Sequence, residues 1–545
     1  MDRKTLFAIG LMLVVAIVPT VLFPPKRPVP PVQLAADSTL RDTTAVAATA
    51  TEPPPLPAKA PGPAAPESAP EERVTVTAPL YQYTFSTRGA RLVGASLTQY
   101  RAFAPGESGP AQLIPDPSEF LAYRLVVGGD TVSLAEWRFE PSAREVNVGP
   151  GATLDWVAGR RQVEVRLRYT FIPEQYLFRV EGAVSGLGTG GLVLIGLGPR
   201  LRVVDADSVG DIRTYGVVTK ANSTQNLGFA SLDPGERREL AGPFEWVAIK
   251  SKYFMTAVLT TDEGGPRLGG AVAVGGERPG RHESRVHVAT SLAAPSGRFQ
   301  FAVYAGPQEH RRLARLGHDL EDINPYGWIF RPIIRPFATF IMQILLWMHD
   351  ALHLAYGWVL VLFGIGVRVL LWPLNQKAMR SSVAMQAIQP EMKALQDRYK
   401  NDPQKMQQEL FKLYKEHGVN PLGGCFPMLL PMPVLFALFF VFANTIQFRG
   451  VPFLWLPDLS RADPLYIIPL VMGLSMYALS KIGQIGIPPN PQAKMMLYIM
   501  PVMFTVLFLN FSSGLNLYYA VSNIASLPQQ WLIARERLRK VARTT

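Results

Sequence analysis

The sequence is almost without cysteine. Cys425 is the single cysteine among 545 residues, so the chain cannot form an intrachain disulfide. One thiol is also too few for a structural zinc site built on cysteines. Any exported part of the chain must therefore be held together by packing alone.

Charged residues are scarce as well, at 18% of the chain against 48% hydrophobic residues. This balance excludes a set of ordinary soluble domains and a wholly disordered chain. The net charge of +12 could suggest nucleic acid. However, no basic stripe interleaved with aromatic residues accompanies it, and the positive charges lie beside long apolar runs. They predict the orientation of a membrane protein.

Common enzyme motifs are missing. The chain has no HExxH, GxSxG or Walker A sequence, and its glycine-rich stretches lack the setting of a phosphate loop. His349 and His353 have a spacing that could hold a metal, but no further ligand is nearby. We therefore expect no catalytic residues, no cofactor and no metal.

The amino-terminal segment predicts a membrane anchor followed by a spacer. After Arg3 and Lys4, residues 5–23 are uncharged and long enough to cross a bilayer. A cleaved signal peptide is the alternative, although it would have a shorter apolar region and a small-residue cleavage site. We expect an anchor at 1–23 and a Pro/Ala-rich linker at 24–73.

Residues 74–322 consist of short segments in which polar and apolar residues alternate, and Gly, Pro and Asp separate these segments. In residues 162–169, for example, polar and apolar side chains alternate with the period of a strand that has one buried face. No apolar run of membrane-spanning length interrupts this part. It predicts an all-β sandwich domain.

Residues 323–350 predict an amphipathic helix that lies in the membrane interface. Arg331 and Arg335 are one turn apart among Trp, Phe and Ile residues. An ordinary membrane span is the alternative, and the two prolines and two arginines argue against it.

Residues 351–533 predict a core of five transmembrane helices. Together with the anchor at 1–23, the chain is expected to have six membrane spans. The predicted spans are 352–373, 422–444, 465–482, 494–510 and 514–533. Residues 375–420 and the tail 534–545 are basic, which places both, and both termini, in the cytoplasm. The fold class is thus a polytopic α-helical membrane protein whose β domain lies outside the cytoplasm.

The basic segment 375–420 predicts an antiparallel helical hairpin. Asp402 can cap its second helix and Pro403 can open it. The hairpin could be a solvated spacer or a docking surface for a ribosome, a targeting factor or an emerging substrate.

Arg368 stands inside an apolar span. A charge at membrane depth costs about 2.5–3.5 kcal/mol even on the lenient insertion scale, so something must solvate it. The side chain could snorkel to the headgroups, or it could line a hydrated pocket that is open to the cytoplasm. Gly364 and Gly366 would let a neighbouring helix or a substrate come close.

Several motifs together resemble the YidC/Oxa family of membrane protein insertases, over almost the whole chain. They are Tyr-Gly-Trp at 326–328, Arg368 followed by Trp-Pro-Leu at 372–374, Gln-Pro-Glu at 389–391 and, above all, Val-Asn-Pro-Leu-Gly-Gly-Cys-Phe-Pro at 419–427. The anchor, linker and large β domain resemble the family's Gram-negative form, in which that domain is periplasmic.

The resemblance implies an insertase of the bacterial inner membrane that acts on nascent membrane proteins, alone or with the Sec translocon. It places Arg368 in a hydrophilic groove open to the cytoplasm and to lipid. Substrate would slide along the spans 422–444 and 494–510. The residues expected near it are Met432, Leu435, Met472, Phe504 and Tyr518. Pro431 departs from relatives that carry a polar residue there.

Two other classes of function predict different features. A transporter or channel with an exported β domain predicts paired inverted repeats and polar residues at depth on several spans, whereas this sequence has one charged residue at depth. A passive periplasmic scaffold predicts that the β domain is essential and that Arg368 is replaceable.

Overall fold

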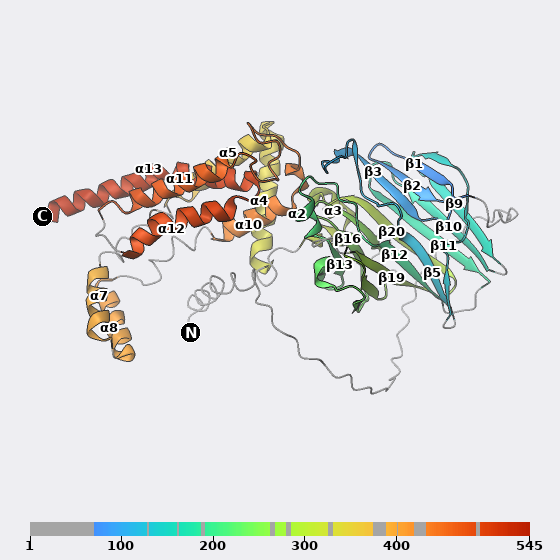
Figure 1. The fold of residues 1–545 in the computed structure, drawn as a ribbon, viewed down its shortest axis with the longest axis horizontal. Helices are drawn as coiled ribbons and strands as arrows, with labels where there is room; N and C mark the ends of the chain where they lie inside the picture. Colours follow the sequence, from blue (N-terminus) through green and yellow to red (C-terminus); the bar gives the residue numbers. More distant parts are fainter. Residues whose placement is uncertain are drawn as a thin grey trace. The chain divides into compact units, whose positions relative to one another are not determined.

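The computed structural model describes residues 70–127, 130–160, 163–186, 191–261, 267–278, 285–324, 331–373, 376, 388–400, 402–418, 432–486 and 491–544. The predicted anchor 1–23 and nearly all of the predicted linker 24–73 lie outside these residues. The chain divides into a β unit, Ala48–Pro325 with Asn444–Gln447, and a helical unit, Tyr326–Ala443 with Phe448–Thr545. Figure 1 shows the strands of the one and the helices of the other.

The described strands of the β unit form three sheets of five, nine and six strands. The first has the order β4 (Pro110–Gln112), β3 (Leu92–Arg101), β2 (Tyr81–Ser86), β1 (Arg73–Thr77) and β8 (Glu145–Asn147). The second has the order β14 (Thr224–Gly228), β13 (Gly216–Lys220), β16 (Trp246–Lys250), β17 (Phe254–Leu259), β20 (Arg298–Pro307), β11 (Leu177–Ser185), β10 (Val163–Phe171), β9 (Thr153–Arg160) and β7 (Glu140–Pro141). The third has the order β15 (Arg237–Leu240), β18 (Ala271–Gly275), β19 (Val286–Ala294), β12 (Gly191–Gly198), β5 (Phe120–Val127) and β6 (Asp130–Ser133).

An aromatic core joins the sheets. On β10 every second side chain is buried, as the period of a half-buried strand requires, and Tyr169 is one of them. Its ring centroid lies 5.3 Å from that of Phe85 on β2, and its hydroxyl lies 3.0 Å from that of Tyr123 on β5. The nine-stranded sheet thus packs against both smaller sheets, which confirms the predicted β domain.

Strands β13, β16 and β17 are buried along their whole lengths. A segment made of α3 (His310–Leu316) and η2 (Leu320–Ile323) contacts this part of the sheet. Trp246 Nε1 donates to His318 O at 2.9 Å, and Lys220 Nζ lies 2.6 Å from Asp319 Oδ2. Because both faces are covered, these strands are apolar almost without alternation. Two short helices complete the unit, α2 (Ser208–Ile212) and η1 (Phe229–Ser231).

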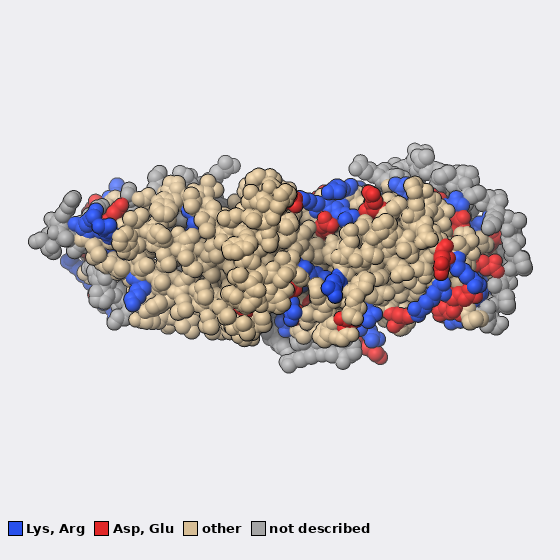
Figure 2. All heavy atoms as spheres, turned by 90° about the horizontal axis from the view of Figure 1, so that it is seen from above, with Lys and Arg blue, Asp and Glu red and all other residues tan. Residues whose placement is uncertain are grey.

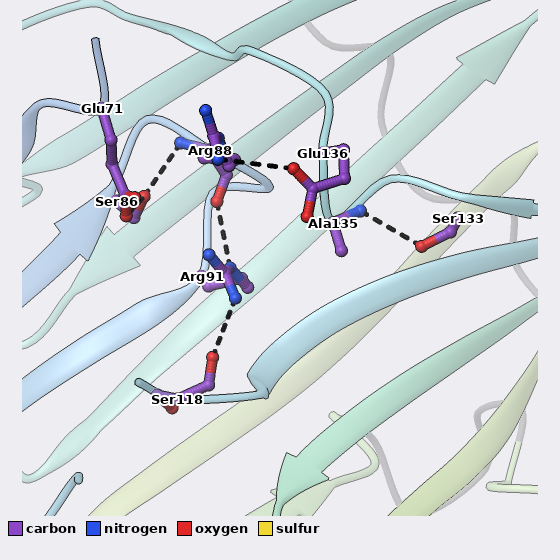
Figure 3. Close-up of polar contacts among 8 residues, drawn as sticks. All are labelled: Glu71, Ser86, Arg88, Arg91, Ser118, Ser133, Ala135 and Glu136. Carbon is purple, nitrogen blue, oxygen red and sulfur yellow. Dashed lines mark hydrogen bonds and ion pairs between the residues drawn. The ribbon is translucent and has the colours of Figure 1, made fainter. Parts of the chain in front are cut away.

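Polar contacts fix the turn between β2 and β3 (Figure 3). Ser86 Oγ donates to Glu71 Oε1 at 2.5 Å, and Arg88 pairs with Glu136 at 3.5 Å. Arg91 donates to the carbonyls of Arg88 and Ser118. Both ends of this turn are therefore tied to neighbouring segments.

The helical unit contains α4 (Arg331–Leu352), α5 (Tyr356–Leu370), α7 (Gln389–Arg398), α8 (Pro403–Glu416), α10 (Met432–Asn444), η4 (Ile446–Phe448), α11 (Ile467–Gly483), α12 (Pro491–Phe508) and α13 (Ser513–Thr544). Here α13 packs along α5 and α11, and α11 packs along α12. The last helix continues to Thr544, through the segment that the sequence separates as a tail.

No single described helix is long and apolar enough to cross a membrane by itself. Residues 334–352 and 356–370 have the required length and composition only as a pair, which is bent by 119°. The six predicted spans therefore stay a prediction. In α8, the Asp402 carboxylate accepts from Lys405 N at 3.0 Å and Pro403 is the first helical residue, which confirms the predicted start.

Candidate insertion site

Helix α5 carries Arg368, and neighbouring segments pack closely against it at two glycines. A Cβ atom added to Gly357 would lie 2.0 Å from the ring of Phe453, and one added to Gly364 would lie 3.3 Å from Val521 of α13. Nothing described lies within 4 Å of the corresponding point on Gly366. Gly364 and Gly366 were both predicted to let a neighbouring helix come close. Helix α13 does so at Gly364, whereas nothing described approaches Gly366.

Arg368 is half-buried near the end of α5. The phenol groups of Tyr518 and Tyr519 lie close enough to act on its guanidinium electrostatically. Within the described part of the chain, no carboxylate pairs with it. A guanidinium in apolar surroundings is costly unless an anionic group or water solvates it.

A series of aromatic contacts leads from this arginine into the helical unit. Phe363 of α5 lies 5.8 Å from Tyr518, measured between ring centroids, and Tyr518 lies 5.3 Å from Tyr519. Tyr519 then contacts Phe508 at 5.7 Å, and Phe508 contacts Phe504 at 6.0 Å. The surroundings of Arg368 and the last turn of α12 therefore belong to one packed cluster.

Four of the five residues predicted to lie beside the substrate share this hydrophobic cluster. Met472 and Tyr518 are 3% and 5% exposed, whereas Leu435 and Phe504 are only partly buried. Met432 begins α10, and its side chain lies outside the described residues. The structure therefore brings these residues together, and their contact with a substrate stays a prediction.

An exposed apolar stripe on α12 was not predicted. Its residues share one side of the helix and are between 48% and 64% exposed: Ile499, Val502, Met503 and Val506. Leu497 and Phe508 are buried on the other side. The spacing of three and four residues is present in the sequence, but a helix that is apolar all round gives no sign of which side is covered.

The loop between α10 and α11 closes one end of the unit. The buried carboxylate of Asp463 accepts from the backbone N–H of Ile468 at 2.8 Å and from Trp455 Nε1 at 3.2 Å, so it caps the start of α11. Ser513, at the start of α13, donates its hydroxyl to Asp458 O at 3.1 Å.

The opposite end of the helical unit is basic. In Figure 2 this unit is almost free of charged side chains along its visible length, and Lys and Arg gather where α13 ends. Arg535 lies over the ring of Trp531, with its guanidinium carbon 5.3 Å from the ring centroid. An aromatic residue beside a cation is typical of a helix end at a membrane surface.

The β unit contains a second group of buried ionisable residues. Burial, together with the nearby charge of Asp205, raises the pKa of Asp211 to about 7. The carboxylate accepts from Lys252 N at 2.9 Å and from the Tyr215 hydroxyl at 3.3 Å. Burial lowers the pKa of Lys250 to about 8, and its Nζ donates to Asn324 Oδ1 at 2.5 Å. The last of these contacts joins strand β16 to Asn324, whereas the contacts of Asp211 hold α2 against Tyr215 and Lys252.

No described group of three His, Cys, Asp or Glu side chains could hold a metal ion. His349 instead contacts Leu354 O through Nδ1 at 2.6 Å and stacks on Tyr356 with ring centroids 4.0 Å apart. It thereby supports the turn between α4 and α5.

Two family models match the chain, the YidC periplasmic domain over residues 73–348 and the 60Kd inner membrane protein over residues 347–540. The chain is similar to the membrane protein insertase YidC of Chloroherpeton thalassium, with 30% identity over 502 residues, 85% of this chain and 83% of that protein. The YidC insertase of Chlorobaculum tepidum is 30% identical over 498 residues, 84% of this chain and 81% of that protein. A crystal structure of YidC from Thermotoga maritima aligns with 84% of this chain and 99% of that one, with 15% identity and a TM-score of 0.31.

Proposed function

The chain belongs to the YidC family of membrane protein insertases, and we propose that it inserts nascent proteins into the bacterial inner membrane through a hydrophilic groove around Arg368. The observation that carries this proposal is a guanidinium half-buried among apolar helices, with two phenols and no described carboxylate near it. Placing such a charge at membrane depth costs free energy unless water or a passing polar segment solvates it.

The proposed mechanism needs no covalent chemistry, no cofactor and no metal. Arg368 attracts the acidic or polar outer segment of a substrate and lowers the free energy of bringing it partway across the membrane. The apolar segment then enters lipid, and burial of its surface at about 25 cal/mol per Å² drives the reaction.

The place of Arg368 along α5 supports a groove over snorkelling. Gly357 contacts the loop that closes one end of the unit, and Arg368 follows eleven residues later, about 16 Å along the helix. With that loop at the outer boundary, Arg368 lies in the inner half of a hydrocarbon layer of about 30 Å, still below the headgroups. The buried hydrogen bonds of Asp463 support closure of the groove on the outer side.

The proposed topology has six spans with both termini in the cytoplasm. The spans are 1–23, 352–373, 422–444, 465–482, 494–510 and 514–533, and the β domain 74–322 lies in the periplasm. Residues 323–350 lie in the membrane interface. This last assignment is supported by the bend of 119° between α4 and α5, and by Phe340 and Trp347, which are 61% and 62% exposed on α4.

The proposed path of the substrate follows α10 and α12, beside Met432, Leu435, Met472, Phe504 and Tyr518. Two of these side chains are buried, so the exposed stripe of α12 is the surface that a sliding segment meets first. A flexible methionine such as Met503 suits contact with many different apolar sequences.

The proposed partners outside the bilayer are the Sec translocon and, through the hairpin 375–420, a ribosome or a targeting factor. On α8, Phe411 is 59% exposed in a sequence that also contains Lys405, Lys412 and Lys415. An exposed aromatic residue among lysines suits an acidic partner with an apolar contact point.

Complementation of a bacterium depleted of its own insertase tests the proposal. The full chain and a variant that lacks residues 74–302 are expected to restore insertion of a small single-span protein, because the helical unit carries the function. Failure of the full chain would contradict the insertase function. Failure of the deletion variant alone would favour the scaffold.

A further inference from the structure

Two polar side chains of α13 reach the backbone of other helices at the end of the unit nearest Arg368. Gln529 Nε2 donates to Trp372 O at 2.9 Å. Arg537 Nη1 donates to Gly483 O and to Ile485 O, each at 2.9 Å. Residues 529 and 537 are eight positions apart, so they lie on the same side of the helix. One face of α13 therefore holds the chain at the ends of α5 and α11.

At the end of α11 the acceptor needs a partner from outside its own helix. The last carbonyls of an α-helix have no intrahelical donor, and Gly483 is the last residue of α11. Trp372 lies two residues beyond the end of α5, in the helical turn that follows it. Gln529 is only 6% exposed, so its amide would itself be costly without a partner.

The end of α11 is also fitted closely to α13. A Cβ atom added to Gly483 would lie 2.5 Å from Gln530 Nε2. Gly486 has a φ of +77°, and a Cβ atom there would lie 3.4 Å from Arg537 Cδ. Larger residues at these two positions would push the helices apart or strain the backbone.

We propose that Gln529 and Arg537 form a polar clasp that sets the position of Arg368, which makes them positioning residues for insertion. This inference rests on the proposed role of Arg368. Gln529 holds the backbone four residues, about one helical turn, beyond Arg368. Arg537 holds α13 to α11, so the clasp fixes the end of α5 against both helices. Without it, the guanidinium moves relative to the phenols of Tyr518 and Tyr519.

The first test is the variant Gln529→Met, which keeps the length of the side chain and removes the donor. The full-length protein in proteoliposomes is given two single-span substrates that differ only in an acidic or a neutral outer segment. Insertion of the acidic substrate is expected to fall roughly two- to tenfold, as for loss of one hydrogen bond. Insertion of the neutral substrate is expected to be unchanged.

A double variant separates positioning from general damage. In an Arg368→Ala background, Gln529→Met is expected to cause no further loss, because both changes act through the same charge. Equal loss for both substrates, or additive losses in the double variant, would mean that Gln529 only stabilises the protein. Either result would overturn the clasp as a positioning device.

Arg539 supplies a matched control for Arg537. It lies two residues further along the same basic segment, is exposed, and makes neither of these bonds to α11 among the described residues. Arg537→Met is expected to lower insertion of the acidic substrate, and Arg539→Met, which removes the same charge, to leave it unchanged. Equal effects would assign the loss to net charge and overturn the role of Arg537.

A distance measurement tests the clasp without reference to insertion. Spin labels at Leu370→Cys and Leu474→Cys, in a Cys425→Ser background, report the separation of α5 and α11, and both sites are well exposed at 76% and 68%. Gln529→Met is expected to broaden this distance distribution. An unchanged distribution would overturn the clasp even if Arg368→Ala impairs insertion. A broadened distribution together with a silent Arg368→Ala variant would overturn the proposed groove around Arg368 instead.

Discussion

Gly473 of α11 faces Thr505 of α12 so closely that a Cβ atom added to the glycine would lie 2.0 Å from Thr505 Oγ1. The threonine hydroxyl donates to Pro501 O at 2.7 Å, so it occupies a fixed position within its own helix. The two helices approach at this level because one side chain is missing. Met472 and Phe504, two of the residues predicted near the substrate, are their direct neighbours in sequence.

We expect Gly473→Ala to destabilise the protein by about 1–3 kcal/mol, because the added methyl group overpacks the contact between α11 and α12. Thr505→Ala should restore most of the loss in the double variant, since it removes the clashing hydroxyl. Thermal unfolding of the purified protein in detergent measures both effects. Gly366→Ala is the control, because nothing described lies within 4 Å of that methyl group. Equal destabilisation by the two substitutions would contradict the close approach.

The cap of α11 gives a second prediction. Asp463→Ala removes the acceptor for the N–H groups of Leu465 and Ile468 and for the indole of Trp455. The expected loss of stability is about 1–3 kcal/mol, the range for a lost helix cap and an unsatisfied buried donor. Protease cleavage within residues 449–466 should become faster. Asp397→Ala, an exposed aspartate of α7, is the control and should behave like the wild type.

The pKa of Asp211 predicts an unusual dependence of stability on pH. Burial raises this pKa from 3.8 to about 7, so between these values the unfolded carboxyl is ionised while the folded one keeps its proton. The contribution of Asp211 to stability is therefore complete below about pH 4 and is lost as the pH rises towards 7. The loss of folding free energy over this range is about 1.4 kcal/mol for each pH unit.

Asp211→Asn should remove this loss, because an amide cannot ionise and can still accept from Lys252 N. In urea-dependent proteolysis of the full-length protein, the stability of the variant relative to the wild type is expected to increase as the pH rises from 4 to 7. A difference between the two that stays constant with pH would show that Asp211 ionises normally in the folded domain.

The sequence predicts the β domain because the alternation of polar and apolar residues along a strand is a local signal. The side chains of β10 alternate between buried and partly exposed, as residues 162–169 indicate. The cap at Asp402 was predictable for the same reason, since its bonded partner is three residues away.

Contacts between distant residues could not be predicted in this way. Gln529 and Trp372 are 157 positions apart, and nothing in the sequence near either residue indicates the other. The complete burial of β16 also depends on a segment that follows about 70 residues later. Tyr518 of α13 is buried beside Gly364 of α5, which no local pattern indicates, and its place beside a substrate stays a prediction. Local pattern gives the elements, whereas tertiary packing decides which faces remain exposed.

The central claim is that the charge of Arg368 receives polar outer segments. Its most direct test is the rate at which the wild type, Arg368→Lys and Arg368→Ala insert two single-span substrates that differ only in whether the outer segment is acidic or neutral. We predict that Arg368→Ala slows the acidic substrate several-fold and not the neutral one, and that Arg368→Lys restores most of the rate because it keeps the charge. Equal rates for wild type and Arg368→Ala with both substrates would mean that the arginine merely reaches the headgroups, and would contradict the groove.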